Sequence, residues 1–125
     1  MALIRGKNTR PEMAVRKLVH GLGYRYRLHG PRIPGKPDLV FNGRRKVIFV
    51  HGCFWHRHPD STCKLARMPK SRLEFWTPKL EKNRLRDERV SEELAEQGWQ
   101  ALTIWECQLV DIHAVSEQVR SFLDR

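Results

Sequence analysis

The spacing of apolar residues predicts a helix near each end of the chain. The segment TRPEMAVRKLVHGLG opens with a capping box, because Thr9 precedes Glu12 by three residues. Its apolar residues recur at helical spacing: Val15, Leu18, Val19 and Leu22. The last predicted helix, DIHAVSEQVRSFL, carries its apolar residues on one face: Ile112, Val115, Val119 and Phe122.

Shorter apolar runs between these helices predict strands. YRYRL alternates with a period of two, ALTIW reads as a further strand, and DLVF and KVIFV flank NGRR as in a β-hairpin. If NGRR is a four-residue loop, Phe41 pairs with Lys46 and Asp38 pairs with Phe49. We therefore expect Asp38 to lie beside Val50, at the end of the second strand of the hairpin.

The segment EFWTPKLEKNRLRDERVSEELAEQGW predicts a long helix, with Thr77 as its cap and Pro78 in its first turn. One face of this helix carries apolar and polar residues together: Leu80, Asn83, Asp87, Val90 and Leu94. Helix, strands, helix, strand and helix in this order favour an α/β or α+β fold with a mixed sheet. A length of 125 residues without repeats or linkers predicts a single domain, 1–125.

A formal charge of +10 narrows the partner class to polyanions, most often nucleic acid, although a generally basic surface is the simpler alternative. No apolar window reaches the roughly 18 residues of a membrane span, and the N-terminus lacks a signal-peptide pattern. We expect a cytoplasmic protein with no membrane contact. Three cysteines cannot all pair, so metal binding or catalysis explains them better than disulfides.

The cysteines and one histidine have a spacing that suits a metal. Cys53, His58 and Cys63 lie five and five residues apart, and Cys107 follows 44 residues later. Three thiolates and an imidazole complete a tetrahedron around Zn²⁺ with no open position, which is typical of structural zinc. Three buried reduced cysteines and a surface histidine remain the alternative.

A second set of residues suits hydrolytic chemistry. Asp38 follows GKP at a strand start, where a hard cation could bind its carboxylate and the backbone carbonyl of Val50; a turn aspartate is the alternative. His51 and His56 bracket GCFW, and an imidazole is the natural group to take a proton from water at neutral pH. For each histidine, an ordinary surface or zinc-adjacent position is the alternative. Asp87, on an apolar helix face, could orient such a histidine; the alternative is a narrower apolar face that leaves Asn83 and Asp87 solvated.

The aromatic residues Phe54, Trp55 and Trp76 lie in polar or basic surroundings. Rings in such settings stack on bases or wedge between base steps, whereas core packing is the alternative.

The motifs GKPDLVF, VIFVHGCFWHRH, EFWTPKLEKNRLRD and GW…IWEC, in this order, resemble the very short patch repair (Vsr) endonucleases. The resemblance runs from about Met1 to Cys107. It implies a restriction-endonuclease-like fold related to the PD-(D/E)XK nucleases, with helices flanking a central mixed sheet. It also implies a magnesium-dependent nick in double-stranded DNA, 5′ of the thymine in a T:G mismatch left by deamination of 5-methylcytosine.

The resemblance implies a role for each matching residue. Asp38 and the carbonyl of Val50, where the family often has threonine, would bind Mg²⁺. His56 would be the general base, Asp87 its partner, and Glu12 and His51 further active-site residues. The implied structural zinc ligands are Cys53, His58, Cys63 and Cys107. The implied intercalating residues are Phe54, Trp55 and Trp76.

The sequence departs from the family pattern in two places. The segment between His58 and Cys63 is longer, so we expect a differently shaped zinc loop. The family usually has an N-terminal arm before IRGKNT that clamps DNA, and this sequence begins almost at that point, which predicts a trimmed arm or a weaker grip. We expect a monomer at work on the bacterial nucleoid, with other mismatch-repair proteins as candidate partners. The remaining alternatives are a restriction-type nuclease that cuts both strands and a non-catalytic zinc-bearing DNA-binding module.

Overall fold

The computed structural model of the chain describes residues 9–60 and 62–125. Its helices and strands follow one another as α1 (Arg10–Gly21), β1 (Arg27–Leu28), β2 (Leu39–Phe41), β3 (Lys46–His51), α2 (Leu73–Glu96), β4 (Gln100–Trp105) and α3 (Ile112–Asp124). The sheet has the order β1-β2-β3-β4, with antiparallel pairs up to β3 and a parallel β3–β4 pair. This confirms the predicted mixed sheet and the predicted order of elements.

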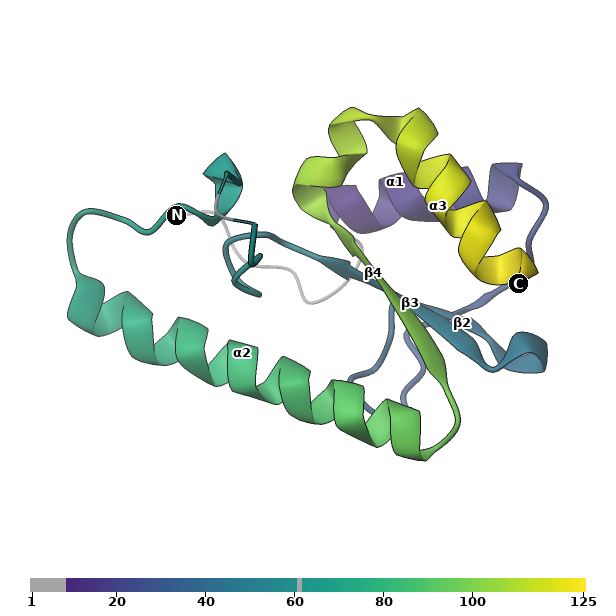
Figure 1. Cartoon of the computed structure of the whole chain (residues 1–125), viewed down its shortest axis with the longest axis horizontal. Helices are drawn as coiled ribbons and strands as arrows, with labels where there is room; N and C mark the ends of the chain where they lie inside the picture. The colour runs from purple at the N-terminus through teal and green to yellow at the C-terminus, as the bar shows by residue number, and fades with distance from the viewer. Residues whose placement is uncertain (1–8, 61) are drawn as a thin grey trace.

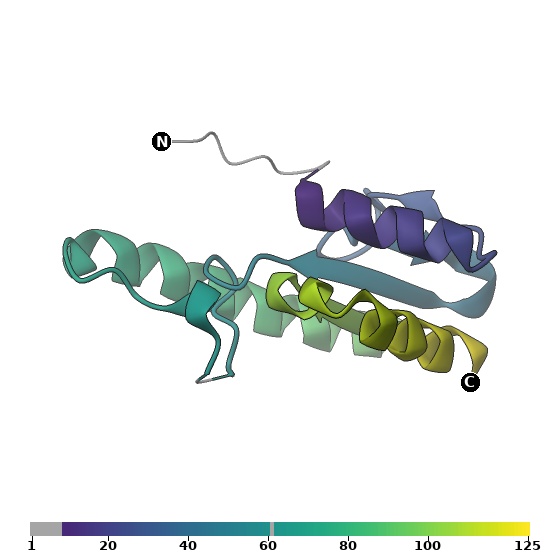
Figure 2. The ribbon, with the colours of Figure 1, turned by 90° about the horizontal axis from the view of Figure 1, so that it is seen from above.

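The sheet lies between two layers of helices. In Figure 1, α1 and α3 cover one face of the sheet and α2 runs along the other. In the view from above in Figure 2, α1 and α3 run alongside each other. The face under α1 and α3 holds the larger apolar core: Val15, Val19, Leu39, Phe41, Ile48, Ile104, Val115, Val119, Phe122 and Leu123. The face under α2 holds a smaller one: Val40, Val47, Leu94 and Trp99.

The hairpin has the register that the sequence predicted. Phe41 pairs with Lys46 and Leu39 with Ile48. Side chains alternate between the two faces of a strand, so Asp38 lies on the same face as Val40, toward α2. The backbone N–H of Val50 donates to Oδ2 of Asp38 at 2.6 Å, which confirms that these two residues are neighbours.

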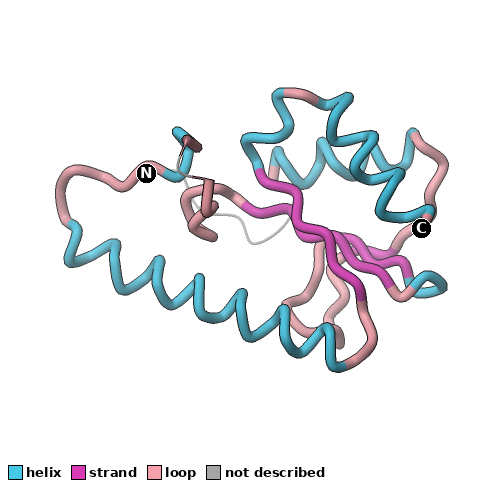
Figure 3. Tube along the Cα trace, viewed as in Figure 1, coloured by secondary structure: helices cyan, strands magenta, loops and turns pink. Residues whose placement is uncertain are grey.

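The parallel pairing of β3 and β4 decides where the functional loops begin. His51 at the end of β3 pairs with Trp105 at the end of β4. The carboxyl ends of parallel strands meet at one edge of a sheet, so the loop after β3 and the turn at Glu106–Val110 leave the sheet side by side. In Figure 3 this loop and the first turns of α2 extend beyond the sheet.

The longest helix begins earlier than predicted. Thr77 and Pro78 are not its cap and first turn: α2 begins at Leu73, after Arg72 in a left-handed conformation (φ 58°), and Pro78 lies inside the helix. A proline in a helix gives up one backbone hydrogen bond. The added turn places the ring of Trp76 against aromatic rings of the loop after β3, a packing contribution that the local pattern does not contain.

Two further expectations were wrong in extent. YRYRL forms only a two-residue strand, β1, whose residues are both exposed. Ile112 is 47% exposed, because the buried stripe of α3 starts one turn later, at Val115, and ends with Leu123. None of the helices within the described ranges is long and apolar enough to span a membrane. The expectation about the N-terminal arm concerns residues 1–8, which lie outside the described residues.

Candidate active site

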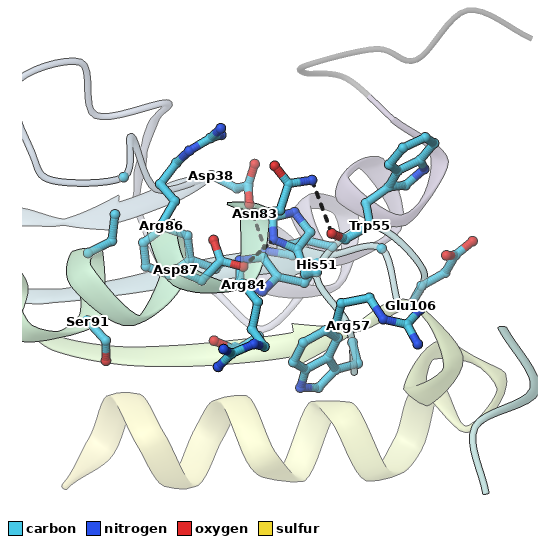
Figure 4. Close-up of a pocket in the computed structure, with 18 of the residues that line it drawn as sticks. Asp38, His51, Trp55, Arg57, Asn83, Arg84, Arg86, Asp87, Ser91 and Glu106 are labelled. Carbon is cyan, nitrogen blue, oxygen red and sulfur yellow. Dashed lines mark hydrogen bonds and ion pairs between the residues drawn. The ribbon is translucent and has the colours of Figure 1, made fainter. Parts of the chain in front are cut away.

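A groove opens between α2 and the end of β3, and it collects residues from five separate segments. Figure 4 shows Asp38, His51 and Asp87 gathered at its centre, with Asn83 of α2 beside them and Trp55 at one end. The predicted hydrolytic residues all line it: Glu12, Asp38, Val50, His51, His56 and Asp87. Lys79, Lys82 and Arg86 of α2 line the same groove. This surrounds the carboxylates with the positive charge that a phosphate backbone requires.

The environment of Asp38 makes its negative charge costly without a cation. Burial raises the pKa of the Asp38 carboxyl to about 7, the bond from the Val50 N–H lowers it, and the nearby Glu12 raises it again. A divalent cation would offset the burial and the repulsion between the two carboxylates. Asp38 and Glu12 therefore suit Mg²⁺, which binds through one or two carboxylates and keeps several waters.

The sequence interpretation named Glu12 as a site residue but missed two residues that contact it, His29 and Arg16. Glu12 is almost fully buried, and its Oε2 lies 2.8 Å from Nε2 of His29. The guanidinium of Arg16, one turn further along α1, binds the same carboxylate. Glu12, His29 and Asp38 bring their ligand atoms within 4.8 Å of one another. The signal that could have found His29 was its position directly after the strand that pairs with β2, opposite Asp38.

The predicted histidine pair is present with its orienting carboxylate. Nδ1 of His56 lies 2.6 Å from Oδ2 of Asp87, and the rings of His51 and His56 are stacked at 3.8 Å between centroids. Burial and the neighbouring His56 lower the pKa of His51 to about 4, so His51 is neutral at neutral pH. Asn83, one turn before Asp87, donates to the backbone carbonyl of Trp55 at 3.2 Å and ties the loop to α2.

The three cysteines and His58 meet at one point next to this groove. Their ligand atoms all lie within 4.8 Å of one another. Nδ1 of His58 is 3.5 Å from Sγ of Cys107, and the N–H of Cys107 donates to Sγ of Cys53 at 3.4 Å. A tetrahedron with Zn–S bonds of about 2.3 Å has edges of about 3.8 Å, so this donor set fits zinc. The residues group as the sequence predicted.

The aromatic residues form a cluster of their own. The ring centroids of Phe54, Trp55 and Trp76 are 5.1 to 5.7 Å apart, with edge-to-face geometry. Phe75 extends the cluster to the exposed start of α2. Neither apolar core of the sheet includes these rings. The three rings are partly exposed, and Trp55 lines the groove.

The fold is similar to that of a solved structure, and the sequence is similar to a known family. Its structure matches the catalytic domain of the homing endonuclease I-Bth0305I with a TM-score of 0.62, over 92% of this chain and 94% of that one, at 22% identity. This similarity shows that the two chains share a fold. The profile of the DNA mismatch endonuclease Vsr family matches residues 1–63.

Individual relatives agree with that profile. The chain is 52% identical over 124 residues to the type II nicking enzyme V.XorIIP of Xanthomonas oryzae pv. oryzae, which covers 99% of this chain and 89% of the relative. It is 42% identical over 109 residues to the DNA mismatch endonuclease Vsr of Escherichia coli, which covers 87% of this chain and 68% of the relative. The chain belongs to the Vsr family and is a DNA endonuclease that acts on phosphodiester bonds, which excludes the non-catalytic module.

Proposed function

We propose that this protein is a magnesium-dependent endonuclease that nicks duplex DNA 5′ of the thymine in a T:G mismatch. The nick would start the repair of deaminated 5-methylcytosine. One observation carries the proposal: the half-buried Asp38 beside Val50 lines the same groove as the His56–Asp87 pair, together with basic side chains. Metal-dependent hydrolysis of a phosphodiester needs a cation site and a general base that reach the same phosphate group.

The chain's own residues divide the work between positioning and proton transfer. Asp38 and the carbonyl of Val50 would hold the Mg²⁺, which supplies charge stabilisation at the phosphate oxygens. His56 donates its Nδ1 hydrogen to Asp87, which leaves Nε2 as the base that takes a proton from the attacking water. The neutral His51 stacks on this ring and restricts its rotation. Glu12 shares the cation site with Asp38.

Zinc would hold the loop after β3 in one conformation and would take no part in the reaction. Cys53, His58, Cys63 and Cys107 would bind it and so close the loop after β3 onto the turn after β4. The residues between the ligands in this loop include Phe54, Trp55 and His56. A rigid loop therefore positions both the aromatic rings and the general base.

The aromatic rings would provide the selectivity. Phe54, Trp55 and Trp76 would intercalate beside the mismatch, since a weakly paired step costs less free energy to unstack. We propose that residues 1–125 act as one domain and as a monomer, because a nick needs one active site whereas a double-strand cut needs two. V.XorIIP is named a nicking enzyme, which favours the same choice. Other mismatch-repair proteins remain candidate partners.

The test is a nicking assay on two duplexes that differ only in one T:G or T:A pair, each with and without Mg²⁺. We expect one nick, in the thymine strand of the T:G duplex, that depends on Mg²⁺. Asp38→Asn protein serves as the control for contaminating nucleases. Equal cleavage of both duplexes would contradict mismatch specificity, and cleavage of both strands would favour the restriction-type alternative.

A further inference from the structure

His29 makes two contacts that none of the roles above explains. Its side-chain Nε2 lies 2.8 Å from Oε2 of Glu12. Its backbone N–H donates to the carbonyl of Asp38 at 3.1 Å. One residue therefore touches both acidic residues of the proposed cation site, from a segment that belongs to neither of their elements.

The backbone of His29 is held in an unfavourable conformation. Its φ of 50° lies in the left-handed region, which glycine adopts freely and other residues adopt at a cost. A residue that served only to make this turn would be better as glycine. Strained non-glycine residues gather at functional sites, where the side chain is needed in that place. The side chain of His29 points to Glu12 and is 26% exposed, so it is not there to fill the core.

The charges around Glu12 explain why such a contact is useful. Glu12 is 3% exposed at its side chain and shares its surroundings with a second carboxyl group, Asp38. Two neighbouring carboxylates repel each other, and without fixed donors they would turn apart or take up a proton. Nη2 of Arg16 lies 3.2 Å from Nε2 of His29, and both groups contact the same oxygen of Glu12. The two side chains form a pair of donors at one oxygen of Glu12.

We propose that His29 is a positioning residue of the cation site. Through Nε2 it orients the Glu12 carboxylate, and through its backbone it holds that carboxylate next to the strand of Asp38. The inference rests on the proposed function, in which Glu12 and Asp38 share a divalent cation. Residues that orient cation-binding groups are worth about 10- to 100-fold in metal affinity or activity.

Three substitutions of His29 separate this role from a structural one. Glutamine places an amide nitrogen where the imidazole has Nε2, whereas asparagine is too short but tolerates the left-handed backbone. Glycine removes the side chain and the strain together. His20→Gln, on the exposed last turn of α1, is the matched control for a histidine-to-glutamine change. Each protein is measured for its melting temperature, its affinity for the T:G duplex without divalent metal, and its nicking rate as Mg²⁺ is titrated.

We expect His29→Gly and His29→Asn to melt at or above the wild-type temperature and to bind DNA as the wild type does. They should need about 10-fold more Mg²⁺ for half-maximal nicking, or nick at least about 10-fold more slowly. His29→Gln should stay within about threefold of wild type, as should His20→Gln. Glu12→Gln combined with His29→Gly should be no worse than Glu12→Gln alone, since one residue acts through the other.

Wild-type Mg²⁺ dependence in His29→Gly would overturn the inference, and so would a loss in His29→Gln as large as in His29→Gly. If His29→Gly does not fold, the asparagine and glutamine variants decide the matter by the same comparison. Failure of the proposed function has a different signature, because the wild-type protein itself would then not nick the T:G duplex.

Discussion

Two clusters of side chains with ligand atoms close enough to surround a cation lie near the end of β3, and they are assembled in opposite ways. The first cluster is Cys53, His58, Cys63 and Cys107; the second is Glu12, His29 and Asp38. The first takes three of its four members from one short loop, and Cys107 comes from the turn after β4. The second takes one member each from α1, from the residue after β1 and from the residue before β2.

The two clusters also differ in the type of ligand that they offer and in how open they are. The first offers soft ligands that fill a tetrahedron and leave no open position. The second offers carboxylates in a groove that is open to a phosphate chain and already holds cationic neighbours. The closed cluster would hold the loop after β3 in place, and the open cluster would take part in the reaction. Each cluster should therefore fail in its own way when it is damaged.

The sharpest way to test this separation is Asp38→Asn. The open cluster would lose the carboxylate that binds the cation, and several kcal/mol of charge stabilisation would disappear from the reaction. We expect nicking to fall below about one thousandth of wild type, while zinc content and metal-free affinity for DNA remain unchanged. Single-turnover nicking, elemental analysis and duplex binding measure the three quantities. Nicking within about tenfold of wild type would remove Asp38 from the mechanism.

The reverse experiment is Cys107→Ser. Loss of one ligand opens the tetrahedron, and zinc binding contributes to the free energy of folding by several kcal/mol or more. We expect zinc loss and a lower melting temperature, with nicking lost only as the loop unfolds. Wild-type protein should carry one zinc ion per chain in elemental analysis. Metal-replete wild-type protein that contains no zinc would reject this assignment.

A smaller loss of nicking rate is expected when His56 or Asp87 is replaced. His56→Ala and Asp87→Ala should each slow nicking by about 10²-fold, because their Nδ1–Oδ2 contact of 2.6 Å makes them one unit. The double variant should be little slower than His56→Ala. Single-turnover rates at saturating Mg²⁺ measure this. Multiplicative losses would show that Asp87 does not act through His56.

A change of pH should also separate the clusters. Burial raises the pKa of Asp38 from 3.8 to about 7 in the metal-free protein. The protonated form is therefore favoured in the fold, and this group lowers the stability of the metal-free protein as pH rises through that range. Mg²⁺ must displace the proton, so the Mg²⁺ needed for half-maximal nicking should rise about tenfold per pH unit below about 7. A requirement that does not change between about pH 6 and pH 8 would contradict this.

The smallest effect concerns selectivity. Trp55→Ala and Trp76→Ala should reduce the preference for T:G over T:A by about tenfold, since one stacked ring is worth roughly 1–3 kcal/mol. General affinity and its salt dependence, which lysines and arginines set, should change less. Binding and nicking of both duplexes at two salt concentrations measure this. If the preference survives and only affinity falls, recognition would have to lie in the basic loop at 64–72.

Local patterns were sufficient wherever residues act within a few positions of one another. The capping of α1 by Thr9, whose side chain accepts from the N–H of Glu12, follows from three-residue spacing. The register that sets Asp38 beside Val50 follows from the length of the NGRR loop. The three loop ligands of the soft cluster are visible as spaced cysteines and a histidine.

The start of α2 was missed for a physical reason. Proline normally marks a first turn, and the local pattern around Thr77 and Pro78 favours a start there. In the folded chain, the preceding turn packs Trp76 against Phe54 and Trp55, and this contact offsets the missing N–H of Pro78. Propensity is a weak guide when such long-range contacts act against it.

By itself, the sequence determined the strand register, the amphipathic faces, the soft ligands and the presence of an acidic residue at a strand start. All of these depend on spacing along one element or across one short turn. Only the tertiary structure decided that His29 and Arg16 join Glu12, because α1, β1 and β2 meet there through sheet pairing and helix packing. A contact between segments far apart in the sequence leaves no periodic pattern, and it becomes visible only when the chain has folded.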